Sequence, residues 1–194
     1  MRLKLLCCIV LLSSLMNAQD ITDSYLEERH IDSLIVLFDR HADDTLTAER
    51  IARKYIEKAR LVNDSTKIAR GYTRLSFVSD RREAIKFLDT AIQLSKNSTH
   101  KNFPTVGYLF KSYYLYENEE YERSLQSALL GYQSAREKNQ IGHQITALHQ
   151  INDINELWGD YQEALEAHLL TYKLLQQNKN SEQYDKTICR PWKG

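Results

Sequence analysis

Glycine, proline and cysteine are scarce in this chain of 194 residues, which contains six, two and three of them respectively. Glycine and proline are common in turns, so few turns in this chain can depend on them. A fold of long helices is therefore favoured. At this length the apolar residues suffice for one globular core or for one short array of repeats.

An excess of charge is also lacking, because 26 lysines and arginines balance 26 aspartates and glutamates. Surfaces that bind nucleic acid usually carry a basic excess or a basic stripe, so the balance argues against nucleic acid as a partner. An acidic disordered segment is excluded as well, since 42% of the residues are hydrophobic and 12 are tyrosines.

The N-terminus has the pattern of a secretory signal peptide. Arg2 and Lys4 precede an apolar run over residues 5–15, and the small residue Ala18 precedes a polar stretch. The run is shorter than the ~20 apolar residues that a membrane-spanning helix needs. We therefore predict that residues 1–18 are a signal peptide cleaved near Ala18 and that the protein is exported, periplasmic or at the cell surface. The mature chain is not expected to insert into a membrane. Retention of the segment as an anchor is the alternative.

Removal of this segment would take away Cys7 and Cys8 and leave Cys189 as the one thiol. No disulfide could then form within the chain, which excludes a small secreted fold held by disulfides. No histidine or asparagine context marks Cys189 as catalytic, and a free surface thiol is the simpler interpretation. The helical pattern fades after Asn180, so residues 179–194 are expected to form an irregular tail.

The body of the chain is repetitive, because a shift of 40 residues aligns chemically similar positions three times. The same shift aligns Ala48 and Ala52 with Leu88 and Ile92, which predicts a fourth, more degenerate copy at the start. The aligned columns are Asp80, Glu120 and Asp160; Ala84, Ser124 and Ala164; Ile85, Leu125 and Leu165; Leu88, Ala128 and His168; Ile92, Tyr132 and Tyr172; Ile68, Tyr108 and Leu148; and Leu75, Leu115 and Asn155.

Within each copy the apolar residues have helical spacing. Leu125, Ala128, Leu129 and Tyr132 lie at i, i+3, i+4 and i+7, which is the stripe of an amphipathic α-helix. Two helices of about 16 to 20 residues and a short turn account for one copy. Turns are expected at residues 63–65, 97–99, 118–120, 139–142 and 159–160, and Pro104 is expected to open a helix.

The segment 159–166, Gly-Asp-Tyr-Gln-Glu-Ala-Leu-Glu, resembles the turn and second-helix start of the tetratricopeptide repeat. Residues 120–125 and 82–85 are weaker matches to the same stretch, and the resemblance covers about residues 22–178. The glycine of that family's first helix is replaced by Tyr72, Ser112 and Asn152.

The resemblance implies an all-α, right-handed superhelical solenoid of about four hairpins, which we assign to residues 19–178. The chain also resembles the exported repeat regions of Bacteroidetes regulators. Those regulators continue into a membrane helix and a DNA-binding or kinase domain.

The resembling family lines an inner face with the first helix of each pair, and this implies a non-enzymatic scaffold that binds a protein or peptide partner. The alternative is the extracytoplasmic sensor part of a signal-transduction or transcriptional regulator. Aromatic anchors with mixed polar groups are typical of such a face. Each residue alone is better explained as ordinary solvated surface, and only the cluster makes the two interpretations equal. The candidate contact residues are Arg70, Thr73, Tyr113, Tyr116, His149, Gln150, Asp153 and Glu156.

Signatures of an enzyme are lacking. The six histidines never form a His-Glu-x-x-His spacing, and there is no glycine-rich phosphate loop and no serine elbow. The sequence therefore predicts no catalytic residue, no metal and no cofactor, and a helical hydrolase remains the competing interpretation. His168 falls in an apolar column and is expected to be a core histidine. Leu169, Leu170, Leu174 and Leu175 leave apolar surface on the last helix. Two interpretations are open: the chain is a shortened relative of a longer regulator, or this end docks on a partner.

Overall fold

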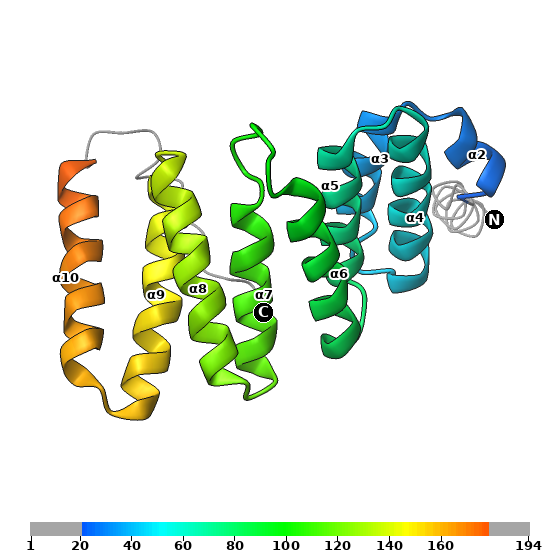
Figure 1. Cartoon of the computed structure of the whole chain (residues 1–194). Helices are drawn as coiled ribbons and strands as arrows, with labels where there is room; N and C mark the ends of the chain where they lie inside the picture. Colours follow the sequence, from blue (N-terminus) through cyan, green and yellow to red (C-terminus); the bar gives the residue numbers. More distant parts are fainter. Residues whose placement is uncertain (1–20, 179–194) are drawn as a thin grey trace, which may run out of the picture.

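The computed structural model describes residues 21–178, which contain nine helices and no strand (Figure 1). The predicted all-helical fold is therefore confirmed for this part of the chain. The predicted signal peptide, the predicted tail and all three cysteines lie outside the described residues. The helices are α2 Asp23–Glu28, α3 Ile31–Arg40, α4 Thr45–Leu61, α5 Ser65–Ser76, α6 Arg81–Ser95, α7 Thr105–Glu117, α8 Tyr121–Glu137, α9 Ile141–Trp158 and α10 Tyr161–Gln177.

Aspartates start three of these helices. The side chains of Asp44, Asp64 and Asp80 each accept hydrogen bonds from backbone N–H groups two or three residues further on, at 2.9–3.2 Å. Such a cap satisfies N–H groups that have no partner within the helix and places a negative charge at the positive end of the helix dipole.

Asparagine occupies the left-handed position in two of the four tight turns that have one. Asn63, Glu119, Asn139 and Gly159 have φ angles of 52°, 62°, 53° and 80°, and each lies between two helices. Asparagine tolerates this left-handed region better than most residues, which explains how a chain with six glycines can make so many turns. The predicted turns at 63–65, 118–120, 139–142 and 159–160 all coincide with helix boundaries.

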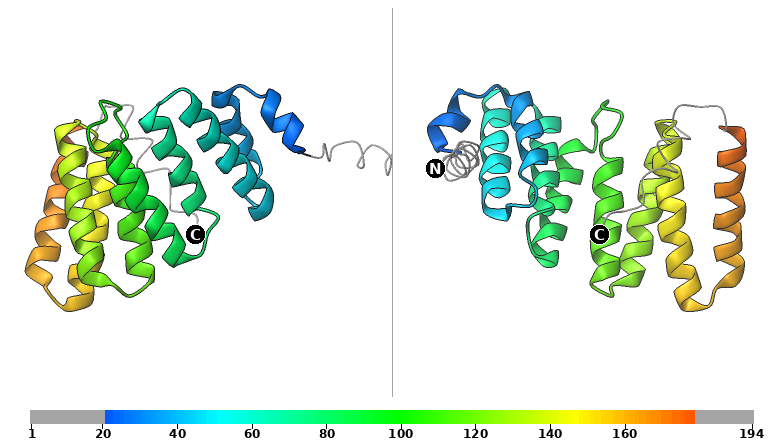
Figure 2. Two further views of the ribbon diagram at one scale, coloured as in Figure 1. Left: turned by 45° about the vertical axis from the view of Figure 1, so that its right-hand side comes forward. Right: turned by 180° about the vertical axis from the view of Figure 1, so that it is seen from behind.

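From α3 to α10 the helices pack in chain order, each against the one before and the one after. α2 packs on α4, and α7 also contacts α9. Figures 1 and 2 show them side by side in a row that starts with α2 and ends with α10. Residues far apart in the sequence therefore meet only when their helices are neighbours or next neighbours. This is a repeat-like helical architecture.

The register of the first copy differs from the prediction. The N-cap positions of α4, α6, α8 and α10 are Asp44, Asp80, Glu120 and Asp160, so successive copies are offset by 36, 40 and 40 residues. Ala48, not Asp44, is thus the counterpart of Ala84. The uniform shift of 40 is wrong here because it aligned side chains without their helix caps.

With the corrected register, the small-residue column continues through α4, α6, α8 and α10 and is buried in each of them. Ala48, Ala84 and Ser124 are 0% exposed and Ala164 is 3% exposed. Ser124 donates from Oγ to the carbonyl oxygen of Ser112 at 2.7 Å, across the α7–α8 pair. A small side chain at this position therefore lets the two helices of a pair approach closely.

Helix lengths vary more than expected. α4, α8 and α10 have 17 residues and α9 has 18, within the predicted range. α5, α7 and α6 have only 12, 13 and 15 residues, below that range. Although α5 and α6 are short, the repeat period of 40 residues is kept because a long loop connects Ser95 to Thr105. Pro104 is the N-cap residue of α7.

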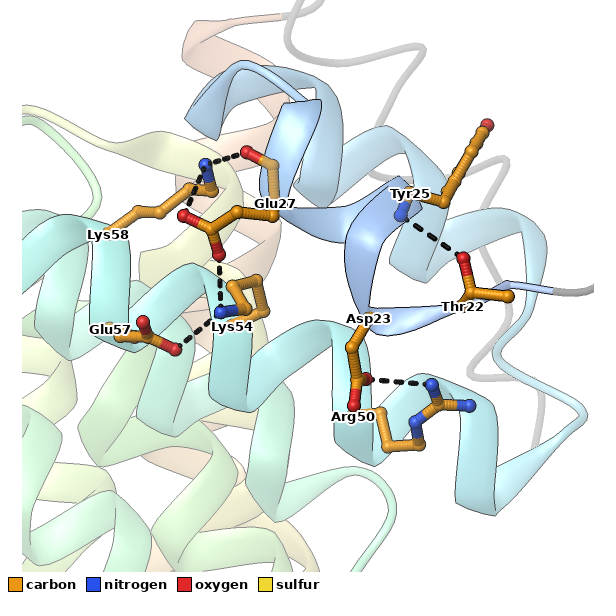
Figure 3. A network of polar contacts seen from close by, with 8 residues as sticks. All are labelled: Thr22, Asp23, Tyr25, Glu27, Arg50, Lys54, Glu57 and Lys58. Carbon is orange, nitrogen blue, oxygen red and sulfur yellow. Dashed lines mark hydrogen bonds and ion pairs between the residues drawn. The ribbon is translucent and has the colours of Figure 1, made fainter.

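The N-terminal end of the row is closed by α2. Leu26 of α2 is 1% exposed and packs into a cluster with Leu34, Phe38 and Tyr55. Above it, α2 is tied to α4 by polar contacts (Figure 3): Lys54 Nζ lies 2.6 Å from Glu27 Oε2, and Arg50 Nη2 lies 2.8 Å from Asp23 Oδ1. The hydrogen bonds that Lys54 donates to the carboxylates of Glu27 and Glu57 raise the pKa of Lys54. Because Glu27 and Asp23 are well exposed to water, these pairs contribute little to stability and the burial of Leu26 is the main anchor.

Replacement of Leu26 by alanine is expected to lower the free energy of unfolding by at least about 2 kcal/mol, because it removes buried methyl groups and leaves a cavity. Leu46→Ala is the matched control, since Leu46 is 75% exposed at the start of α4. It should change stability by less than about 0.5 kcal/mol. Urea unfolding followed by circular dichroism measures both, and equal losses in the two variants would contradict the assignment of α2 as the anchored end.

Candidate partner-binding face

The candidate contact residues all lie on first helices of pairs, but they form two separate groups. Arg70 and Thr73 lie on α5, Tyr113 and Tyr116 on α7, and the other four on α9. Since α7 and α9 contact each other, the second group is brought together. We call the surface formed by Tyr113, Tyr116, His149 and Asp153 the α7–α9 face; Glu156, also on α9, is not part of it.

Aromatic pairs support the two tyrosines of the α7–α9 face, and both tyrosines are half-buried. Tyr116 packs edge to face on Tyr121, with ring centroids 5.4 Å apart and an interplanar angle of 68°. Tyr113 packs in the same way on Tyr114, at 5.4 Å and 69°. Tyr114 is itself fixed, because its hydroxyl donates to the carbonyl oxygen of Ser76 at 2.9 Å. Contacts of this kind hold the rings in defined orientations before any partner arrives.

Asp153 couples electrostatically to both helices of the face. Burial raises the pKa of Tyr116, and the Asp153 carboxylate raises it further. Partial burial lowers the pKa of His149, and the attraction of Asp153 opposes that effect. Asp153 itself is exposed and forms no ion pair within residues 21–178. Asp153 is thus an exposed carboxylate whose charge acts on Tyr116 of α7 and on His149 of its own helix.

Glu156 lies beside α10 and not beside α7. Its Oε1 is 3.5 Å from Nε2 of His168, whose side chain is 56% exposed. The prediction of His168 as a core histidine is wrong, because in the described part of the chain no helix follows α10 to cover its outer side. Tyr172, which occupies a repeat column, is 62% exposed for the same reason.

Gln150 and Thr73 have structural contacts. Gln150 is half-buried and donates from Nε2 to the carbonyl oxygen of Leu109 at 3.1 Å, which ties α9 to α7. Thr73 is 3% exposed, and its hydroxyl donates to the carbonyl oxygen of Ala69 at 3.0 Å. The prediction of Thr73 as a surface contact is wrong, since the helix phase of α5 turns it into the core.

Arg70 belongs to a different surface, in a shallow depression of about 280 Å³ at the α5 end near Ser98 and His100. Its Nη2 donates to Nε2 of His100 at 3.1 Å. On either side of Arg70 along α5, cationic groups are neutralised by α3: Lys67 lies 3.2 Å from Asp32, and Arg74 lies 3.1 Å from Asp39. The α3–α5 surface is thus occupied by internal ion pairs, unlike the α7–α9 face.

Tyr121 is a part of the face that sequence reasoning missed. It is the first residue of α8, and the turn at 118–120 folds it back against Tyr116. The predicted turn was itself the available signal, because residues on either side of a tight helical turn lie close together.

No set of three histidine, cysteine, aspartate or glutamate side chains within residues 21–178 is placed to hold a metal ion. Among the same residues no helix has the length and apolar character needed to cross a membrane. No protein-family model matches the chain, and no curated protein matches it.

Substitution of Asp153 by asparagine is expected to lower two pKa values at once. The pKa of Tyr116 should fall towards its ordinary value, and the pKa of His149 should fall further below its own, because in both cases the carboxylate stabilises the protonated form. NMR titration of His149 and ultraviolet titration of the tyrosines measure the two shifts. Glu163→Gln is the control and should move neither, and an Asp153 variant with unchanged titrations would show that these groups are not neighbours.

Proposed function

We propose that this chain is a non-enzymatic scaffold that binds a peptide or protein segment on the α7–α9 face. In this proposal α3–α4, α5–α6, α7–α8 and α9–α10 are four tetratricopeptide-like hairpins of a right-handed superhelical solenoid, and the α7–α9 face is part of its concave side. The packing of helices in chain order and the small-residue column shared by all four pairs support the proposal. The predicted signal peptide would place the binding event outside the cytoplasm.

The observation that carries the proposal is the contrast between the two first-helix surfaces. Between α3 and α5, the charged side chains of Lys67 and Arg74 already have carboxylate partners at 3.2 and 3.1 Å. On the α7–α9 face, Asp153 has no such partner within the described residues, and Tyr116 next to it is held by its ring contact. Rigid tyrosines cost little conformational entropy on binding, and a free carboxylate gives direction to a polar contact.

The chemistry of the face defines the partner. Half-buried tyrosine rings accept an aliphatic or aromatic side chain, and Asp153 accepts a hydrogen bond from lysine or arginine. Glu156, one helical turn further along α9, lies towards α10 at 3.5 Å from His168 and is not part of this contact. The proposed ligand is therefore a segment that presents an apolar residue followed by a basic one.

Selection from a phage-displayed library of short random peptides tests the function. Peptides that combine an apolar and a basic residue are expected to be enriched. A Tyr113→Ala, Tyr116→Ala variant should bind them at least about tenfold more weakly, because the rings supply most of the buried contact area. Asp153→Lys, at an exposed position, should instead turn the preference towards acidic peptides.

Tyr161→Ala is the matched control, since Tyr161 is 73% exposed and lies on α10. It should bind the selected peptides as the unaltered protein does. Circular dichroism confirms that each variant is folded. Equal binding by the double tyrosine variant and the unaltered protein would remove the α7–α9 face as the binding surface.

A further inference from the structure

The two ends of the helix row are finished differently. At the N-terminal end, α2 covers the first pair and buries Leu26. At the other end, α10 buries Ala164, Ala167 and Thr171 against its neighbour α9. Its opposite side carries large apolar residues that are more than half exposed. They are Leu165 at 56%, Leu169 at 58% and Tyr172 at 62%.

In the internal helix α6, the residues that correspond to Leu165 and Tyr172 are covered by the next pair, whereas the counterpart of Leu169 in α8, Leu129, is 50% exposed. Ile85 of α6, the counterpart of Leu165, is only 7% exposed. Ile92, the counterpart of Tyr172, lies so close to α7 that a Cβ added to Gly107 would be 2.8 Å from its Cγ1. The exposed stripe of α10 is therefore the kind of surface that elsewhere in this protein receives another helix.

We propose that this stripe is covered by α10 of a second copy of the chain, packed antiparallel around a two-fold axis near Leu169. The partner is a second copy because the charges beside the stripe complement one another under that symmetry. Glu166 and Lys173 are seven residues apart, so they lie on the same side of the helix, two turns from each other. Neither forms an ion pair within residues 21–178.

Antiparallel pairing places Glu166 of each copy opposite Lys173 of the other, because the two residues are equidistant from the proposed axis. The pairing gives two equivalent ion pairs at the edge of one apolar contact, as an isologous interface requires. Parallel pairing would set like charges against each other. A head-to-tail arrangement is disfavoured, since α2 closes the opposite end of the row and its Leu26 is already buried.

Sedimentation equilibrium of the full chain tests the proposal, and the expected species is a dimer. The same measurement on residues 19–194 keeps every described residue and removes the apolar run 5–15 as a second source of association. Leu169→Glu is expected to raise the dissociation constant of the dimer at least about tenfold. Leu46→Glu, at a 75% exposed leucine of α4, should leave it unchanged. A monomeric protein, or a Leu169→Glu variant that dimerises normally, would overturn the proposal.

The orientation of the helices is tested by mixing variants. Glu166→Lys and Lys173→Glu each put like charges across the interface and should weaken self-association. An equimolar mixture of these two variants should recover dimers, because every pair across a mixed interface again joins opposite charges. Failure of the mixture to associate better than either variant alone would contradict the antiparallel arrangement.

A variant that ends at Asn178 distinguishes the second copy from another occupant of the stripe. Dimers of this variant with unchanged affinity support a contact made by α10 itself. If the variant becomes monomeric, or if it dimerises while the full chain is monomeric, then residues 179–194 determine what happens at this surface and the proposal is wrong.

Discussion

Coverage of each helix by its neighbours in the chain is the constraint on which this structure depends. An amphipathic helix of 12 to 18 residues cannot bury its apolar side alone, and the described helices solve this by packing in chain order. The approach must be close, so one position in every second helix is small and fully buried. Where that position is Ser124, its hydroxyl bonds to the Ser112 carbonyl, so the polar group is satisfied and the small size is kept.

The same constraint makes the two ends of the row chemically unlike its middle. The N-terminal core contains large side chains such as Phe38 and Tyr55, closed off by Leu26. Towards α10 a separate buried cluster contains Ala128, Leu148, Ile151 and Ala167, which are smaller on average, and no cluster lies beyond it within the described residues. An interior helix is apolar on two sides because it has two neighbours. Within the described residues α10 has the apolar outer side of an interior helix but packs on α9 alone, and this is why Leu165 is exposed while its counterpart Ile85 is buried.

Much of the fold could be predicted because repeat columns report burial directly: Ala84, Leu88, Leu75 and Leu115 are all buried as their columns indicate. The register of the first copy could not be predicted from these columns. Helix caps, and not apolar residues, determine where a helix begins. The repeat columns also predicted burial wrongly in α10. His168 falls in an apolar column, but within the described residues no further helix packs over it.

Of the candidate site, sequence placed Tyr116 and Asp153 on adjacent first helices, and in the structure the Asp153 carboxylate raises the pKa of Tyr116, second to burial. Thr73 was misplaced because its burial depends on the rotation of α5 about its axis. The close approaches at Gly71 and Gly107, where an added Cβ would lie 2.4 and 2.8 Å from isoleucines of the preceding helices, depend on pair-to-pair packing. No pattern within a single copy carries that information.

The α7–α9 face and the outer side of α10 can act together because they point in different directions. Ala164, Ala167 and Thr171 face α9, so the stripe with Leu169 points away from α9 and from Asp153. A second copy bound to that stripe therefore leaves the face of each copy accessible. Two identical faces on one two-fold particle bind a partner with two matching segments more tightly than one face does, because the second contact forms at a high effective concentration. An exposed apolar helix at the end of the row would then set the valency of the scaffold, while the tyrosines and Asp153 set its specificity.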